Sequence, residues 1–139
     1  MNNQLENQKI LVAGAGGLLG VKIVKNALQQ GASIIAADIN INLMKKRFLS
    51  EGIEIESGTV EYVKLDVTNE SDVKKLFKSK LDITGAVNST YPRNKTYGAH
   101  FFDVSLESFN ENISLHLGSA FLFTQQCAAY FETNKVPFS

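Results

Sequence analysis

Residues 9–20 read KILVAGAGGLLG, and this stretch decides the fold. The apolar run at 9–13 is short and uninterrupted, which is typical of a β-strand buried on both faces of a sheet. Gly14, Gly17 and Gly20 follow it and lead into residues whose apolar positions have helical spacing. A glycine cluster in this strand-to-helix context predicts a dinucleotide-binding turn.

Each glycine has its own use in such a turn. Gly14 permits the tight exit from the strand, Gly17 keeps a Cβ out of the path of a pyrophosphate, and Gly20 allows close packing of helix on strand. The helix N-terminus, with Leu18 and Leu19, offers unpaired N–H groups and the positive end of a dipole. A plain glycine-rich turn is the alternative. A Walker A loop is excluded, because no Gly-Lys-Ser/Thr follows.

Outward from this turn, strand and helix patterns alternate four times. Strands are expected at residues 9–13, 33–37, 59–65 and 81–87. Helices are expected at 17–30, 40–50, 69–80 and 105–131, with Gly31 closing the first and Asn40, Asn69 and Ser105 as N-caps. Asn69 and Asp72 resemble a capping box. A polar and aromatic loop fills 88–104, and the tail 132–139 has no clear pattern.

Crossovers of this length force neighbouring strands to be parallel, and right-handed connections make a doubly wound sheet. The sequence therefore predicts an α/β fold, Rossmann-like, with strand order 3-2-1-4 and one domain over residues 1–139. Elements after the fourth strand and its helix would be absent from this chain.

Acidic residues stand where two of the expected strands end. Asp38 follows the second strand, where a carboxylate accepts hydrogen bonds from adenosine ribose hydroxyls and repels a 2′-phosphate. This position predicts a preference for NAD over NADP, with a turn or capping aspartate as the alternative. Asp66, followed by Val67, ends the third strand and is a candidate contact for adenine. An aspartate that simply enters a helix is an equal alternative there.

Together these residues resemble the short-chain dehydrogenase/reductase family. The glycine spacing is similar to that of its extended members, with Ala13 in place of threonine, and Asp66-Val67 resembles the family's adenine-side pair. Asn88 matches the first residue of the Asn-Asn-Ala-Gly motif, although residues 89–91 depart from it. The resemblance implies an oxidoreductase that transfers a hydride to or from nicotinamide. An extended-type epimerase also fits the glycine spacing.

Within that family, residues 91–94, 101–104 and 115–118 resemble a bacterial subgroup linked to flagellin modification and surface-polysaccharide synthesis. This resemblance implies a sugar or sugar-nucleotide substrate for the complete enzyme.

The family's catalytic set is Asn, Ser, Tyr and Lys. The resemblance puts His116 at the position of the catalytic Asn, while a solvent-facing or locally bonded helix histidine is the alternative. The family's Ser and Tyr-x-x-x-Lys would come after residue 139, so the chain alone is expected to be inactive. Tyr91 and Lys95 have the Tyr-x-x-x-Lys spacing, but Pro92 favours a loop there, and these enzymes need the pair on a helix.

Composition limits the choice of partners. Fourteen basic residues balance fourteen acidic ones, and hydrophobic residues make up 44%, which indicates a globular protein that binds neither nucleic acid nor membrane. No metal-ligand spacing is present. Lys45, Lys46 and Arg47 are interpreted as a solvated helix face, and Cys127 as a small core residue. A single cysteine and a polar N-terminus favour a cytoplasmic location.

The helix expected at 105–131 is the candidate for self-association. Without later elements to cover it, its apolar positions would be exposed, namely Phe109, Ile113, Leu117, Phe121 and Phe123. The sequence therefore predicts a homo-oligomer. It leaves open a second reading, in which the chain is a truncated non-catalytic paralogue that acts as a self-associating interaction protein.

Overall fold

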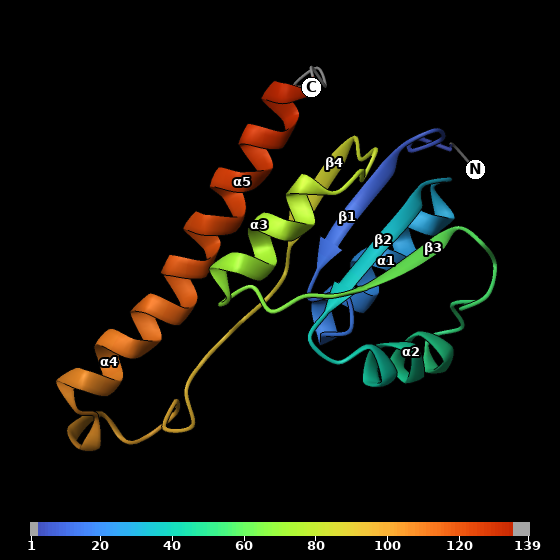
Figure 1. The fold of residues 1–139 in the computed structure, drawn as a ribbon. Helices are drawn as coiled ribbons and strands as arrows, with labels where there is room; N and C mark the ends of the chain where they lie inside the picture. The colour runs from blue at the N-terminus through green and yellow to red at the C-terminus, as the bar shows by residue number, and fades with distance from the viewer. Residues whose placement is uncertain (1–2, 135–139) are drawn as a thin grey trace.

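The computed structural model describes residues 3–134, which form a four-stranded parallel sheet with helices on both faces (Figure 1). The strands are β1 (Lys9–Ala13), β2 (Ser33–Asp38), β3 (Val60–Lys64) and β4 (Gly85–Asn88). Their order is β3-β2-β1-β4, and every neighbouring pair is parallel. The predicted doubly wound fold and its strand order are confirmed.

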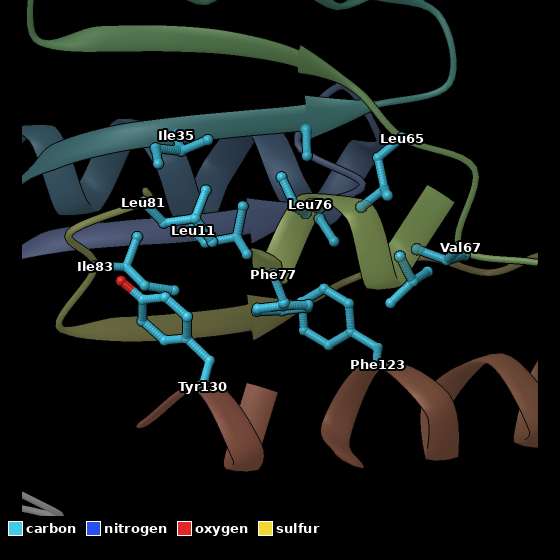
Figure 2. Close-up of a cluster of buried hydrophobic side chains, with 13 residues drawn as sticks. Leu11, Ile35, Leu65, Val67, Leu76, Phe77, Leu81, Ile83, Phe123 and Tyr130 are labelled. Atoms are coloured by element: carbon cyan, nitrogen blue, oxygen red, sulfur yellow. The ribbon is translucent and has the colours of Figure 1, made fainter. Parts of the chain in front are cut away.

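Alternate side chains of the central strands enter two separate cores. On one face Val12 and Ile34 pack beneath α1 (Leu18–Gln29) and α2 (Ile41–Ser50). On the other face Leu11 and Ile35 pack beneath α3 (Glu70–Lys78) and α5 (Ser119–Thr133). Figure 2 shows this second core, with Phe123 and Tyr130 reaching from α5 toward Phe77. Burial on both faces explains why β1 and β2 are almost wholly apolar.

The predicted N-caps and the glycine that closes the first helix are also observed. The side-chain oxygens of Asn40, Asn69 and Ser105 accept hydrogen bonds from the backbone N–H three residues later, as N-caps do. Gly31 follows α1 with φ +93°, a left-handed conformation that glycine adopts without steric cost.

The Asn69–Asp72 pair departs from a reciprocal capping box. Asp72 donates its N–H to Asn69, but its carboxylate accepts the backbone N–H of Asp66 at 2.8 Å instead of that of Asn69. The side chain of Asp72 therefore fixes the turn that leaves β3.

The fourth strand is shorter than predicted. Pairing with β1 begins near Thr84, whose N–H donates to the Lys9 carbonyl oxygen at 2.8 Å, and not at Leu81. Asp82 has φ +54°, so the extended chain is interrupted there. Leu81 and Ile83 are nevertheless buried in the core, which accounts for the strand-like pattern of the sequence.

The last helical stretch is longer and less regular than predicted. It begins as α4 (Leu106–Ile113), continues through a π-helical segment (Ser114–Gly118) and ends as α5 at Thr133. Figure 1 shows one long helix whose α4 end projects beyond the sheet. Residues 132 and 133, predicted to lack structure, are helical, and residues 135–139 lie outside the described part. No helix within residues 3–134 is both long and apolar enough to cross a membrane.

Two further side chains on this stretch differ from expectation. Phe123 is buried rather than exposed, because it packs edge-on against Phe77 with ring centroids 5.4 Å apart. Cys127 is half-buried rather than fully buried, and this burial raises the pKa of its thiol.

Candidate functional site

The glycine turn is tight and held by backbone hydrogen bonds. Gly14 leaves β1 with φ +74°, and its N–H donates to the Ala37 carbonyl oxygen at 2.9 Å. The N–H of Gly17 donates back to the Gly14 carbonyl oxygen at 3.0 Å. The turn therefore joins β1, β2 and the start of α1 in one fixed arrangement.

The three predicted glycines meet different surroundings. A Cβ on Gly20 would lie 2.0 Å from the Gly14 carbonyl oxygen, and one on Gly14 would lie 3.0 Å from the Ser89 backbone. On Gly17 the nearest atom would be the Gly14 oxygen at 3.3 Å. Gly20 is thus required for packing of α1 on the turn, whereas Gly17 meets this one backbone atom and lines the cleft.

Asp38 ends β2 with its carboxylate already oriented. Its Oδ2 accepts the N–H of Gly16 at 2.9 Å, and its Oδ1 accepts the N–H of Asn40 at 3.2 Å. Each carboxylate oxygen can accept a second hydrogen bond, so Asp38 retains capacity for a ligand hydroxyl. The residue therefore both fixes the glycine turn and presents a negative charge beside it.

The prediction that Lys45, Lys46 and Arg47 form a solvated helix face is wrong for Arg47. Its guanidinium donates to the Gly16 carbonyl oxygen, and the residue is half-buried on α2. The Nζ atom of Lys45 lies 4.6 Å from the centre of the Tyr62 ring, and Lys46 is the exposed member of the three.

Asp66 follows β3 and Asn88 is the last residue of β4, so both lie at the carboxyl end of a strand. Oδ1 of Asp66 accepts from the backbone N–H and the hydroxyl of Thr68, at 2.9 and 2.6 Å. Oδ1 of Asn88 accepts from the same two groups of Thr90, at 3.1 and 2.6 Å. The N–H of Ser89 donates to the Ala13 carbonyl oxygen at 2.9 Å, which ties the loop after β4 to the glycine turn.

A cleft of about 990 Å³ opens where these strand ends meet. Eight of the predicted cofactor-binding residues line it: Gly14, Gly17, Leu18, Leu19, Asp38, Asp66, Val67 and Asn88. Gly20, the ninth, lies beneath them against Gly14. Parallel α/β sheets bind ligands outside the carboxyl ends of their strands, where the strand order reverses, and this cleft has that position between β1 and β4.

Several residues that line the cleft were not predicted from the sequence. Ile39, Leu65, Thr68, Ser89 and Thr90 adjoin predicted residues at strand ends, so their position in the sequence was a usable signal. Arg47, Arg93 and Leu115 lie on elements whose approach to the cleft depends on tertiary packing.

His116 does not line the cleft directly. Its ring packs at right angles to that of Tyr91, with centroids 3.8 Å apart, and Tyr91 lines the cleft. The Tyr91 and Tyr97 hydroxyls are hydrogen-bonded, which raises the pKa of the Tyr91 phenol together with a smaller contribution from desolvation. To fill the predicted catalytic role, His116 would therefore have to act through its contact with Tyr91, or its imidazole ring would have to move into the cleft.

Tyr91 and Lys95 lie in the loop after β4, as Pro92 indicated, and not on a helix. The loop is anchored to α4, because Asn94 accepts from the side-chain amide of Asn112 at 3.0 Å and donates its N–H to the same side chain at 2.9 Å. Within residues 3–134 no group of three or more His, Cys, Asp or Glu side chains is arranged to hold a metal ion.

Comparison with known families identifies the chain. Residues 14–136 match the family model described as enoyl-(acyl carrier protein) reductase, one of the models of short-chain dehydrogenases. The chain belongs to the short-chain dehydrogenase/reductase family. The resemblance drawn from the glycine turn, Asp66-Val67 and Asn88 is confirmed at this level.

Curated relatives cover a similar region. The chain is 34% identical over 134 residues to post-translational flagellin modification protein A of Campylobacter coli, covering 92% of this chain and 52% of that protein. It is 26% identical to 2,5-dichloro-2,5-cyclohexadiene-1,4-diol dehydrogenase of Sphingobium indicum, covering 86% of this chain and 47% of the relative. The chain therefore spans about half the length of these relatives.

Solved structures agree on the fold. A short-chain dehydrogenase from Bacillus anthracis superposes with a TM-score of 0.79 at 18% identity, over 95% of this chain and 53% of that one. A short-chain dehydrogenase from Leptospira borgpetersenii with bound NAD+ gives a TM-score of 0.71 at 21% identity, over 95% of this chain and 49% of that one.

Proposed function

We propose that this chain is the NAD-binding portion of a short-chain dehydrogenase/reductase. The observation that carries the proposal is the cleft, because it brings the glycine turn and the polar residues at three strand ends to one site. A nicotinamide dinucleotide would supply or accept a hydride there, and the residues of this chain would bind and orient it.

The residues present fit the parts of such a cofactor. Gly17 lines the cleft at the N-terminus of α1, and the amides of Leu18 and Leu19, which follow it, would face the pyrophosphate. Asp38 retains acceptor capacity for the adenosine ribose hydroxyls, which favours NAD over NADP. Asp66 and Val67 would contact adenine, and Asn88 would lie toward the nicotinamide.

The complete enzyme would move a hydride between nicotinamide C4 and a carbinol or ketone carbon. A sugar or sugar-nucleotide in flagellin or surface-glycan modification is the proposed substrate, a choice supported by the Campylobacter coli relative. The serine and the Tyr-x-x-x-Lys pair of the family would belong to the remaining half of that enzyme. This chain alone would bind cofactor without turnover, and we propose a cytoplasmic location for it.

One observation favours a second function, that of a self-associating interaction protein. Apolar side chains along α4 and the start of α5 are exposed, including Leu106 at 74%, Leu117 at 66% and Phe121 at 64%. A stripe of this kind on a single helical stretch is complementary to itself, so a second copy of the chain is the proposed occupant. Self-association would accompany cofactor binding in the first function and replace it in the second.

Cofactor binding is tested by titrating the chain with NADH and with NADPH, following nicotinamide fluorescence. We expect saturable NADH binding that weakens roughly tenfold or more in Asp38→Ala, because ribose contacts and the bond to Gly16 are both lost. Glu56→Ala, which removes an exposed carboxylate outside the cleft, is the matched control and should bind like the parent. Failure of both cofactors to bind would favour the interaction protein.

A further inference from the structure

The end of the cleft at Asp38, where the adenosine is proposed to bind, contains a positively charged side chain as well as the Asp38 carboxylate. Arg47 comes from α2 and Asp38 from the end of β2, and both line the cleft. They hold the same residue of the glycine turn, since Asp38 accepts the N–H of Gly16 at 2.9 Å and Arg47 donates to its carbonyl oxygen. A negative and a positive group therefore flank the turn together.

Arg47 has donor capacity beyond its bond to Gly16. A guanidinium carries about five N–H donors in a planar fork, and here one terminal nitrogen contacts the Gly16 oxygen. The ion pairs within 4.0 Å among residues 3–134 do not include Arg47. Its charge beside the cleft is thus not taken up by a direct carboxylate contact in the described part of the chain.

These two groups have opposite effects on a cofactor that carries a 2′-phosphate. The Asp38 carboxylate would repel the phosphate, which is the reason that an acid at this position favours NAD. A guanidinium binds phosphate strongly, because it combines charge with paired N–H donors. A cleft with Asp38 alone would exclude NADP, whereas a cleft with both groups would discriminate less.

We propose that Arg47 is a specificity-determining residue that binds the 2′-phosphate of NADP(H) and so weakens the preference for NAD(H) imposed by Asp38. The inference rests on the proposed dinucleotide site. It concerns only the adenosine end, which is built from β1, β2, α1 and α2 within this chain.

The test measures, by isothermal titration calorimetry, the affinities of the chain for NADH, NADPH and adenosine 2′,5′-bisphosphate. Arg47→Gln removes the charge but keeps an N–H that can donate to Gly16. We expect the variant to bind NADPH and the bisphosphate roughly tenfold more weakly, with less than about a threefold change for NADH. Arg47→Lys, which keeps the charge, should retain most of the NADPH affinity.

Lys46→Met is the matched control, because it removes one positive charge from the exposed neighbour of Arg47 and should leave all three affinities unchanged. Circular dichroism establishes that each variant is folded. Should Arg47→Gln unfold, the test is the ratio of NADPH affinity to NADH affinity in Arg47→Lys, compared with the same ratio in the parent. An equal loss of NADH and NADPH binding in Arg47→Gln would overturn the inference, since Arg47 would then only hold the turn. An unchanged NADPH affinity would overturn it as well. If the parent binds neither cofactor, the proposed function fails together with the inference.

Discussion

Gly20 has the tightest surroundings of the glycines in the turn, because a Cβ there would lie 2.0 Å from the Gly14 carbonyl oxygen. That oxygen is backbone and cannot move aside without disturbing the exit of β1. The fingerprint therefore mixes two requirements: Gly20 serves the packing of α1, and Gly17 leaves space for a ligand.

The two substitutions should separate these requirements. Gly20→Ala is expected to lower the free energy of unfolding by about 3 kcal/mol, because α1 must shift away from the turn. Gly17→Ala should change the free energy of unfolding by less than about 1 kcal/mol and should weaken NADH binding instead. Urea denaturation and NADH titration measure the two effects. Equal destabilisation by both substitutions would contradict this division.

The sequence predicted residue roles best where a backbone position determines them. Gly31, Asn40 and Asn69 were predictable because helix ends require particular residue types. Arg47 was not, because a long side chain on a helix can face solvent or reach the neighbouring turn, and only the packing of α2 decides which.

At the scale of elements, α5 is held to the sheet by a few aromatic contacts with α3. Phe123 is 3% exposed and packs against Phe77, whereas Phe121, two residues earlier, is 64% exposed. The two phenylalanines therefore form a matched pair on the same helix.

Phe123→Ala should lower the free energy of unfolding by about 3–4 kcal/mol, because it leaves a cavity between α3 and α5. At concentrations where the chain is monomeric, Phe121→Ala should change it by less than about 0.5 kcal/mol. Thermal and urea unfolding of both variants, compared with the parent, provide the measurement. Similar destabilisation by the two would mean that α5 does not pack as described.

Element boundaries were predictable to the extent that they depend on apolar pattern. Leu81 and Ile83 look like strand residues because they are buried, yet the positive φ of Asp82 keeps them out of the ladder. The π-helical segment at Ser114–Gly118 has no counterpart in the pattern, since a helix with one wider turn has nearly the same apolar spacing.

At the scale of the whole molecule, β4 is an edge of the described sheet, because it pairs with β1 alone. The α4 end of the long helix extends beyond the sheet, as Figure 1 shows, with its apolar side chains exposed. Both surfaces favour association with another chain.

Self-association through the long helix should be sensitive to charge on its exposed stripe. Sedimentation velocity of the parent at high micromolar concentration is expected to give a dimer or larger species. The double variant Leu117→Glu/Phe121→Glu should sediment as a monomer with unchanged secondary structure, because two carboxylates would have to be buried in the interface. A monomeric parent would contradict the proposed interface.

The strand order and the alignment of strand ends were predictable at this scale, since parallel strands with helical crossovers allow few arrangements. The site itself followed from that topology, which is why eight predicted residues share one cleft. The position of His116 behind Tyr91 was not predictable, because it depends on the course of the loop at 88–100.

A ¹⁵N–¹H NMR titration of the chain with NAD+, following every backbone amide, tests directly whether the dinucleotide binds at the carboxyl ends of the strands. We expect little change along α3 and shifts concentrated at the residues that surround the cleft, namely Gly14–Gly20, Asp38, Asp66–Val67 and Asn88. Uniformly unperturbed amides, or shifts confined to α4 and α5, would contradict a dinucleotide site at the carboxyl ends of the strands.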